Sequence, residues 1–546
     1  MRKSYFLLLL LSAVFSACNF KRQEADIVLY NATVYTIDDQ ESVEQAIAIK
    51  DGKIVAVGKD RDILNNFRYS ESIDCKKQFI YPGFIDAHCH FQGYAQMLDQ
   101  VDLVGCKSYD ELVSRVVEFA KQHPNKKVIQ GRGWDHTDWP GKEWPNKSKL
   151  DELLPDVAVV LFRIDGHSLL VNQKAFDLAG VTPSTRIEGG IIEVKDGALT
   201  GVVKENANDV FTALAPAYSY PEELALYKKA EKNLIEMGLT ALVDAGLSLK
   251  SITRLDSIYR EADLQIFLNA MASDLPENFS YFAANKAINQ DRFAVHGFKF
   301  YLDGSLGSRS ACLKKDYHDN PGNKGVLTLT VSDFEEKLKR VKAMGFQAHT
   351  HAIGDSANRV ALQSYAAALG GVNDLRWRIE HAQVVDSTDF MWFKNYSIIP
   401  SVQPTHATSD SKWAEDRLGQ PRIRYAYAYK YLVEQLGIIA LGTDFPVESP
   451  DPLATFVASV ARKNMQLLPE GGFYPEQGLD RMQTLKGMTI WAALSVKWED
   501  KLGSIEKGKY ANLVVLDKDI LKASEADLVK TKVAQTWVAG RLVYKR

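Results

Sequence analysis

The sequence lacks the features that mark several whole classes of protein. Its 546 residues contain five cysteines. None form a CxxC pair, so neither a disulfide framework nor a cysteine-rich zinc site is expected, and those beyond Cys18 are predicted to be buried or free thiols. Basic and acidic side chains nearly balance, 66 against 69. The chain therefore has no excess positive field to attract nucleic acid. The composition, 46% hydrophobic and 25% charged, is that of an ordinary globular protein.

The N-terminus has the pattern of a secretion signal. Arg2 and Lys3 precede the mostly apolar run Phe6–Phe15, which is too short to span a bilayer, and residues 16–18 read Ser-Ala-Cys. This ending resembles a bacterial lipoprotein box, in which Cys18 is lipidated and becomes the mature N-terminus. The resemblance implies an exported, membrane-anchored lipoprotein of the cell envelope. The alternative is an ordinary cleaved signal peptide over residues 1–18 with a chance cysteine.

Short apolar runs alternate with longer amphipathic segments along most of the chain. Strand and helix repeated eight times is the pattern of an α/β protein with a (β/α)8 TIM-like barrel, which we predict over residues 81–502. The predicted strands are Ile80–His90, Leu239–Gly246, Leu264–Met271, Phe293–Asp303, Phe346–Ile353, Leu375–Val385, Ser397–Gln403 and Ile438–Phe445. Helical periodicity is clearest over Glu222–Met237, Asp333–Met344, Ser356–Leu369 and Ile423–Leu436.

Two regions depart from this alternation. Residues 26–80 and 503–546 contain short β-like runs separated by turn signals, which predicts a small composite β-sandwich domain built from both ends of the chain. Residues from about 104 to 218 follow the first barrel strand and are too many for a βα loop. They are predicted to form an inserted subdomain, with a hairpin over Gly189–Val202.

Metal-ligand residues stand at the ends of several predicted strands. His88 and His90 are two residues apart in the first, so both imidazoles point to one face, together with Asp86. His351, His381 and Asp444 end later strands. In a parallel barrel all these ends open onto one mouth, so the histidines and the late aspartate are expected to converge on a divalent metal.

Lys299 is expected to point into the barrel, because it alternates with apolar residues at 298, 300 and 302 in the fourth strand. A buried ammonium is costly unless it is paired. Two solutions stay open: an ion pair with Asp303 or Asp444, or carboxylation of the amine by CO₂ to give an anionic metal bridge.

Several motifs resemble those of a known family. Residues 81–90, YPGFIDAHCH, resemble the first-strand motif of the amidohydrolase superfamily. Other stretches are similar to its YtcJ-like branch, amidohydrolase family 3: GRGWD at 131–135, DGSLGSR at 303–309, HAIGD at 351–355, EHAQ at 380–383, GTDFP at 442–446 and LGSIEKGKYANLV at 502–514. The resemblance implies a metal-dependent (β/α)8 hydrolase with a composite β domain.

The same resemblance implies a ligand set. Residues matching the family's metal ligands are His88, His90, Lys299, His351, His381 and Asp444. Some superfamily members carry the strand-four lysine in carboxylated form. One or two ions are implied, and His/Asp ligation at an open site suits zinc best, with manganese, iron or nickel as alternatives.

The predicted activity is hydrolysis of a C–N bond in a small amide, N-substituted formamide or carbamate, with Asp444 as general base. Candidate substrate contacts are Trp134, Asp303, Arg309, Gln403 and His406. Two alternatives are kept: another metal-dependent hydrolase (deaminase, esterase or lactonase), and a catalytically silent lipid-anchored binding protein. Deaminase-like relatives often place Glu just after the fifth-strand His, where this chain has Ala-Ile-Gly-Asp. The sequence carries no signal for an oligomeric state.

Overall fold

The computed structural model describes residues 22–164, 168–187, 190–212, 214 and 218–546. The predicted signal peptide and Cys18 lie outside these residues. No helix among them is long and apolar enough to cross a membrane. The chain divides into two compact units, Met1–Phe91 with Glu231–Arg546, and Gln92–Ala230.

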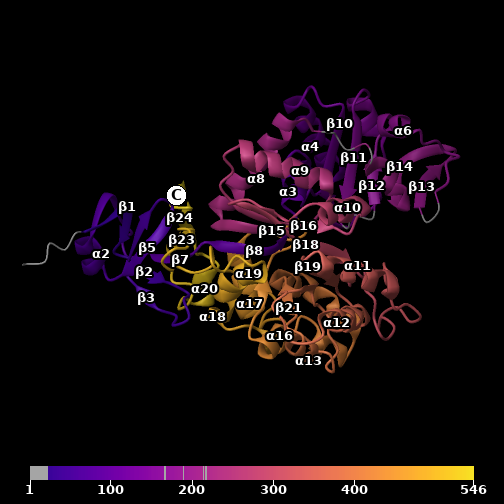
Figure 1. Ribbon diagram of the computed structural model, residues 1–546. Helices are drawn as coiled ribbons and strands as arrows, with labels where there is room; N and C mark the ends of the chain where they lie inside the picture. The colour runs from indigo at the N-terminus through magenta and orange to yellow at the C-terminus, as the bar shows by residue number, and fades with distance from the viewer. Residues whose placement is uncertain (1–21, 165–167, 188–189, 213, 215–217) are drawn as a thin grey trace, which may run out of the picture. The chain divides into compact units, whose positions relative to one another are not determined.

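A nearly closed barrel of eight parallel strands forms the centre of the first unit (Figure 1). The strands are, in sheet order, β8 (Phe84–Cys89), β15 (Leu239–Leu247), β16 (Phe267–Ser273), β18 (Phe293–Tyr301), β19 (Gln347–Ala352), β20 (Arg378–His381), β21 (Ile399–Val402) and β22 (Ala440–Leu441). Backbone hydrogen bonds from Asp444 to His88 and from His90 to Phe445, both 2.8 Å, join the last strand region to the first. All eight predicted strands are confirmed.

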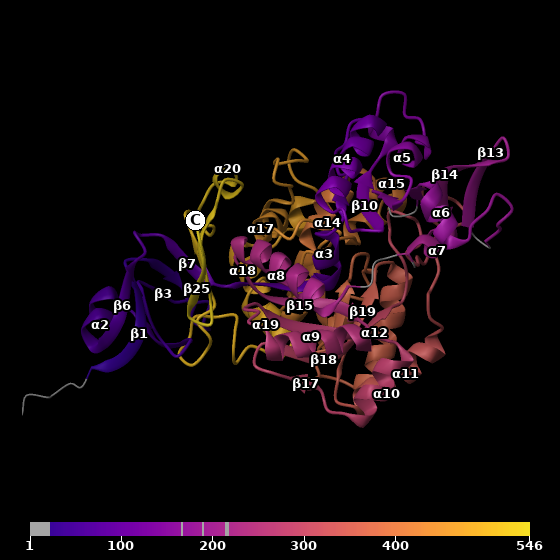
Figure 2. The same cartoon turned by 90° about the horizontal axis from the view of Figure 1, so that it is seen from above.

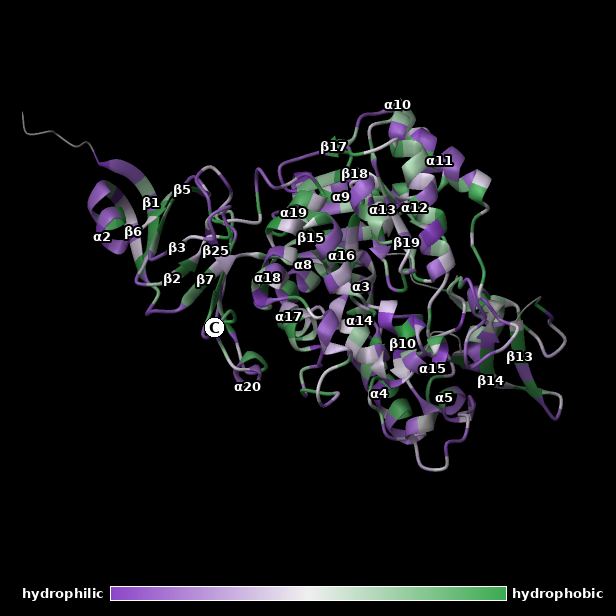
Figure 3. Ribbon diagram, turned by 90° about the horizontal axis from the view of Figure 1, so that it is seen from below, coloured by the Kyte–Doolittle hydropathy of each residue, from purple (hydrophilic) through white to green (hydrophobic). Residues whose placement is uncertain are grey.

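Helices lie outside these strands, as Figure 2 shows for α9, α11 and α12. They are α9 (Leu249–Glu261), α10 (Pro276–Ala284), α11 (Val331–Ala343), α12 (Asp355–Leu369), α13 (Met391–Asn395), α16 (Tyr429–Leu436), α17 (Pro452–Ala461), α18 (Arg481–Gly487) and α19 (Ile490–Ser495). The apolar side chains of β18 face them: Phe298 stacks on Phe279 at 4.6 Å between ring centroids, and Phe300 meets Phe334 at 5.6 Å. Polar and apolar residues alternate along α11 and α12, as the colours of Figure 3 show, because one helix face is buried and the other is wet.

The helix predicted over Ile423–Leu436 is only partly correct. The chain forms a 3₁₀ turn over Arg422–Tyr425, and the α-helix begins only at Tyr429. Tyr427 separates the two because its φ is 52°, in the left-handed region, and its N–H donates to Gln383 O at 2.7 Å. The predicted helices elsewhere correspond to α8 (Tyr220–Glu236), α11 and α12.

Both chain ends contribute to a β-sandwich in the first unit. A four-stranded sheet has the order β5-β4-β1-β6, and a six-stranded sheet has the order β25-β24-β23-β7-β2-β3. Strands β7 and β23 pair antiparallel and so join the N-terminal and C-terminal segments. Apolar residues of both sheets, among them Ile47, Ile49, Leu513 and Trp537, share one core. The strands are β1 (Gln23–Tyr30), β2 (Thr33–Tyr35), β3 (Val43–Glu44), β4 (Ala46–Lys50), β5 (Lys53–Gly58), β6 (Phe67–Asp74), β7 (Phe79–Pro82), β23 (Leu513–Leu516), β24 (Val533–Val538) and β25 (Arg541–Lys545).

The second unit is larger than the predicted insertion and has a six-stranded sheet of its own, ordered β13-β14-β12-β11-β10-β9. Its strands are β9 (Val101–Asp102), β10 (Val128–Trp134), β11 (Ala158–Arg163), β12 (Ser168–Val171), β13 (Gly190–Lys195) and β14 (Ala198–Glu205). Strands β13 and β14 form the predicted hairpin. Its helices include α4 (Tyr109–Gln122), α5 (Ser148–Leu153), α6 (Gln173–Ala179) and α7 (Asp209–Thr212).

Candidate metal centre

The carboxyl ends of three barrel strands bring potential metal ligands together. His88 ends β8, His381 ends β20 and Asp444 follows β22. One donor atom from each lies within 4.8 Å of the others, and all three residues are buried. This is the spacing of donor atoms that can share one cation, and histidine with carboxylate is a usual zinc donor set.

Three further histidines surround this group. His90 Nε2 lies 3.0 Å from Asp444 Oδ1, and His406 Nε2 lies 3.7 Å from Asp444 Oδ2. The ring of His351 is 4.5 Å from that of His381, centroid to centroid. The convergence predicted from the strand ends is therefore present in the geometry, with residues up to 356 positions apart in the chain.

The backbone is strained where it presents two of these side chains. His381 and Asp444 have φ values of 71° and 62°. Residues other than glycine rarely adopt this left-handed backbone conformation, which costs about 1–3 kcal/mol and is tolerated mainly at functional sites. Buried Asp86 stabilises the turn: it accepts hydrogen bonds from the N–H of His88 and of Thr443, and from the Thr443 hydroxyl at 2.6 Å.

The protonation states suit a cation. Burial lowers the pKa of His88 to about 4 and of His351 to about 3, and holds that of His381 well below its usual value. Burial alone would raise the pKa of Asp444, but the hydrogen bond from His90 and the nearby imidazoles hold it well below its usual range. Neutral imidazoles and an ionised carboxylate are the forms that bind metal, and the buried His381 Nδ1 has no hydrogen-bond partner among the described residues. The residues present therefore fit a divalent ion.

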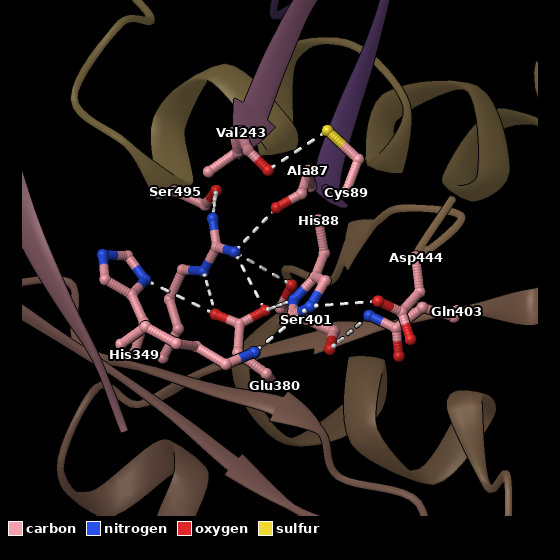
Figure 4. A network of polar contacts seen from close by, with 12 residues as sticks. Ala87, His88, Cys89, Val243, His349, Glu380, Ser401, Gln403, Asp444 and Ser495 are labelled. Carbon is pink, nitrogen blue, oxygen red and sulfur yellow. Dashed lines mark hydrogen bonds and ion pairs between the residues drawn. The ribbon is translucent and has the colours of Figure 1, made fainter. Parts of the chain in front are cut away.

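A buried ionic network holds His88 (Figure 4). Glu380 Oε2 lies 2.6 Å from His88 Nδ1, which leaves His88 Nε2 facing the other ligands. Arg378 donates to both oxygens of Glu380, at 2.8 and 3.0 Å, and also to Ala87 O and the Ser495 hydroxyl. No role was predicted for this pair from the sequence. The sequence did contain a signal for this pair. Two opposite charges two residues apart in a buried strand are expected to pair, because a buried charge without a partner is costly.

Lys299 points into the barrel, as predicted. Its Nζ lies 3.2 Å from His88 Nε2, and burial lowers its pKa to about 8. In the described part of the chain it forms no ion pair with Asp303 or Asp444. Asp303 instead accepts hydrogen bonds from the backbone N–H groups of Ile353, Gly354 and Cys312 and so braces the loop after β19.

A cavity of about 370 Å³ adjoins the cluster and is lined by its side chains. Of the five predicted substrate contacts, His406 is among the lining residues described. Gln403 is buried and donates to Ser401 O at 3.4 Å, and Arg309 forms an ion pair with Asp319 at 2.9 Å. Trp134 is fully buried in the core of the second unit, where its Nε1 donates to Leu161 O. These side chains and Asp303 contact other parts of the protein and are not among the lining residues described, so their role in substrate binding stays a prediction.

The cavity also has lining residues that the sequence analysis missed: Asp410, Trp413 and Glu448. Asp410 comes four residues after His406, and Glu448 four residues after Asp444. The available signal for Asp410 was its place one helical turn beyond His406, at the end of helix α14 (Pro404–Ser409). Glu448 lies in an irregular loop, which gives no such signal.

The fold and the cluster define a class of protein, a metal-dependent hydrolase built on a (β/α)8 barrel. Residues 71–544 match the model of the amidohydrolase family. The chain therefore belongs to that family, and the predicted resemblance to its YtcJ-like branch is confirmed.

Known proteins resemble the chain over nearly its whole length. The putative amidohydrolase YtcJ of Bacillus subtilis is 26% identical over 95% of this chain and 99% of its own. The N-substituted formamide deformylase of Arthrobacter pascens is 24% identical over 96% and 99%. The crystal structure of an uncharacterized metal-dependent hydrolase from Pyrococcus horikoshii superposes with a TM-score of 0.79 at 27% identity, covering 91% of this chain and 99% of that one.

Proposed function

We propose that the protein hydrolyses the C–N bond of a small N-substituted formamide, amide or carbamate. The observation that carries the proposal is the buried carboxylate of Asp444 beside the buried imidazoles of His88 and His381 at the edge of a cavity. Similarity over 96% of the chain to an N-substituted formamide deformylase supports the choice of bond.

The metal would be held by His88, His90, Lys299, His351, His381 and Asp444, as one or two ions, with zinc the best match to the donor set. When bound, such an ion lowers the pKa of a water molecule towards neutrality and polarises the substrate carbonyl.

Asp444 would carry the proton. Its carboxylate takes a proton from the attacking water as the water oxygen bonds to the carbonyl carbon. It then delivers that proton to the nitrogen as the C–N bond breaks, leaving a carboxylic acid and an amine. The low pKa of Asp444 keeps it ionised and ready to accept, and His90 at 3.0 Å holds its orientation.

Lys299 is proposed to react with CO₂, forming an N–C bond and losing one proton, to give an anionic carbamate. Burial lowers its pKa to about 8, so a larger fraction of the amine is unprotonated than in a free lysine. Incubation with ¹³C-bicarbonate should give a carbamate carbon signal by NMR that is absent in Lys299→Ala, and identical spectra would remove this role.

The bond cleaved is tested with metal-loaded protein and a matched panel. N-Butylformamide, butyl formate, a butyrolactone and an aminopurine present the formamide, ester, lactone and deaminase reactions. Release of butylamine faster than the other products supports the proposal. Turnover confined to the ester or lactone, or to the aminopurine, would replace it with that activity, and metal-free protein that binds solutes without turnover would indicate a binding protein.

We also propose that Cys18 is lipidated and anchors an exported protein in the cell envelope, on the pattern of residues 2–18. Metabolic labelling with an alkyne fatty acid in a bacterial host should label the full chain and not Cys18→Ser. Secretion of an unlabelled, soluble wild-type product would favour the ordinary signal peptide.

A further inference from the structure

One wall of the cavity is acidic and aromatic. Asp410 and Glu448 line it together with Trp413, and we call these three residues the acidic wall. The proposed hydrolysis uses none of them, so the chemistry that they would recognise is open.

Hydrogen bonds hold both carboxylates in place at the wall. The Tyr427 hydroxyl donates to Asp410 Oδ2 at 2.7 Å and accepts from Gln383 Nε2 at 2.8 Å. The Ser409 hydroxyl donates to Glu448 Oε1 at 2.6 Å, which ties the loop after β22 to the segment after β21. These contacts hold two carboxylates in neighbouring positions. Burial raises the pKa of Asp410 to about 6, and the nearby Glu448 charge acts in the same direction.

The aromatic member is positioned by a close approach. A Cβ on Gly307 would lie 3.2 Å from the Trp413 ring, so the absence of a side chain at position 307 lets the loop pass against the indole. Carboxylates combined with aromatic faces are the surroundings that proteins use to bind ammonium groups, through charge-assisted hydrogen bonds and cation–π contacts.

The basic groups among the described lining residues are Lys299 and the imidazoles of the metal cluster, of which His406 also acts electrostatically on Asp410. The guanidinium of Arg417 lies 5.4 Å from the Trp413 ring centroid and is itself paired with Asp319. A substrate carboxylate placed at the acidic wall would face the two like charges of Asp410 and Glu448.

We propose that the cavity selects substrates carrying a positively charged nitrogen, separate from the scissile C–N bond, which binds Asp410 and Glu448 against Trp413. This inference rests on the proposed function, since it names the substrate class for that reaction. A charged hydrogen bond formed in a partly buried site is expected to favour the cationic substrate about tenfold or more over a neutral isostere.

Three formamides of similar length test the selection: N-(3-aminopropyl)formamide, N-butylformamide and 4-formamidobutanoate, which are cationic, neutral and anionic. With metal-loaded full-length protein, kcat/KM should fall in that order, by about tenfold at each step. Equal values, or preference for the anion, would overturn the inference and leave the hydrolytic function standing.

Variants assign the effect to the wall. Glu448→Gln and Asp410→Asn should each reduce the ratio of cationic to neutral kcat/KM severalfold. Glu448 is the decisive position if Asp410→Asn misfolds through its bond to Tyr427. Asp416→Asn is the matched control, because Asp416 is exposed, lies near Trp413 in sequence and is not among the lining residues, so the ratio should stay at the wild-type value. An unchanged ratio in Glu448→Gln would overturn the role of the wall.

Binding separates this inference from the proposed function. Calorimetry with butylamine, which is cationic at neutral pH, and with the neutral 1-butanol needs no turnover. Tighter binding of butylamine in wild type, reduced in Glu448→Gln, supports the acidic wall even if no formamide is hydrolysed. Equal binding of the two compounds contradicts it.

Discussion

Replacing Glu380 by Gln should weaken metal binding without touching any proposed ligand. The wild-type carboxylate sits 2.6 Å from His88 Nδ1 and therefore holds the proton on that nitrogen, leaving Nε2 free. A glutamine amide can donate to Nδ1 instead, which favours the tautomer with Nε2 protonated and unable to bind a cation. Loss of such a carboxylate partner typically costs about 10–100-fold in metal affinity, or about 1.4–2.7 kcal/mol.

The same substitution should also destabilise the fold. Arg378 is fully buried and donates to both oxygens of Glu380, so the change leaves its charge without a buried counter-ion. Breaking a buried ion pair in this way costs about 3–5 kcal/mol. Urea unfolding of metal-free protein measures this loss, and competition with a chromophoric chelator measures the metal affinity separately.

Asp389→Asn is the matched control. Asp389 is buried and forms ion pairs with two partly exposed side chains, Arg359 at 2.7 Å and Lys314 at 3.0 Å, away from the cluster. The Asp389→Asn substitution should lower the free energy of unfolding while leaving metal affinity at the wild-type value. Wild-type metal affinity in Glu380→Gln, or an equal loss in Asp389→Asn, would refute the positioning role of Glu380.

Three further changes have defined outcomes. Asp444→Asn should lower turnover of the substrate at least about 100-fold, the typical contribution of a general base, whereas a near-wild-type rate would remove Asp444 from the mechanism. Chelation should lower the thermal midpoint, because an ion at 100 times its Kd stabilises the folded state by about 2.7 kcal/mol, and an unchanged midpoint would contradict the metal site. Burial raises the pKa of Glu231 from 4.5 to about 7, so the folded state binds the extra proton, and stability should fall as pH rises from about 4.5 to about 7. The free energy of unfolding should fall by up to about 3 kcal/mol between pH 5 and pH 8, and by less in Glu231→Gln, as measured by urea unfolding at the two pH values. An equal fall in wild type and Glu231→Gln would contradict this.

The barrel was predictable because its strands are apolar runs between amphipathic helices. In β18 the alternation of Phe298, Lys299 and Phe300 indicated which side chains face the helices, and the ring contacts of both phenylalanines agree. Apart from the hairpin of β13 and β14, the sheet of the second unit was not predicted. The Gly and Trp residues of β10 interrupt the period on which strand prediction depends.

The ligands were predictable from where strands end, but their supports were not. Metal-donor side chains at the ends of predicted strands indicated the ligands His88, His381 and Asp444. The role of Arg378 and Glu380 depends on their pairing with each other and on the contact of Glu380 with His88. That contact joins two strands whose residues are 292 positions apart in the chain. Asp410 begins a 3₁₀ helix and Glu448 lies in a loop, and tertiary contacts such as the Ser409–Glu448 hydrogen bond bring the two together.

Crystals of the full-length protein grown with zinc, measured at the zinc absorption edge, test the central claim most directly. An anomalous peak within about 2.0–2.2 Å of donor atoms of His88, His381 and Asp444 is the predicted result. Fully zinc-supplied crystals that show these three side chains with no ion among them would contradict it.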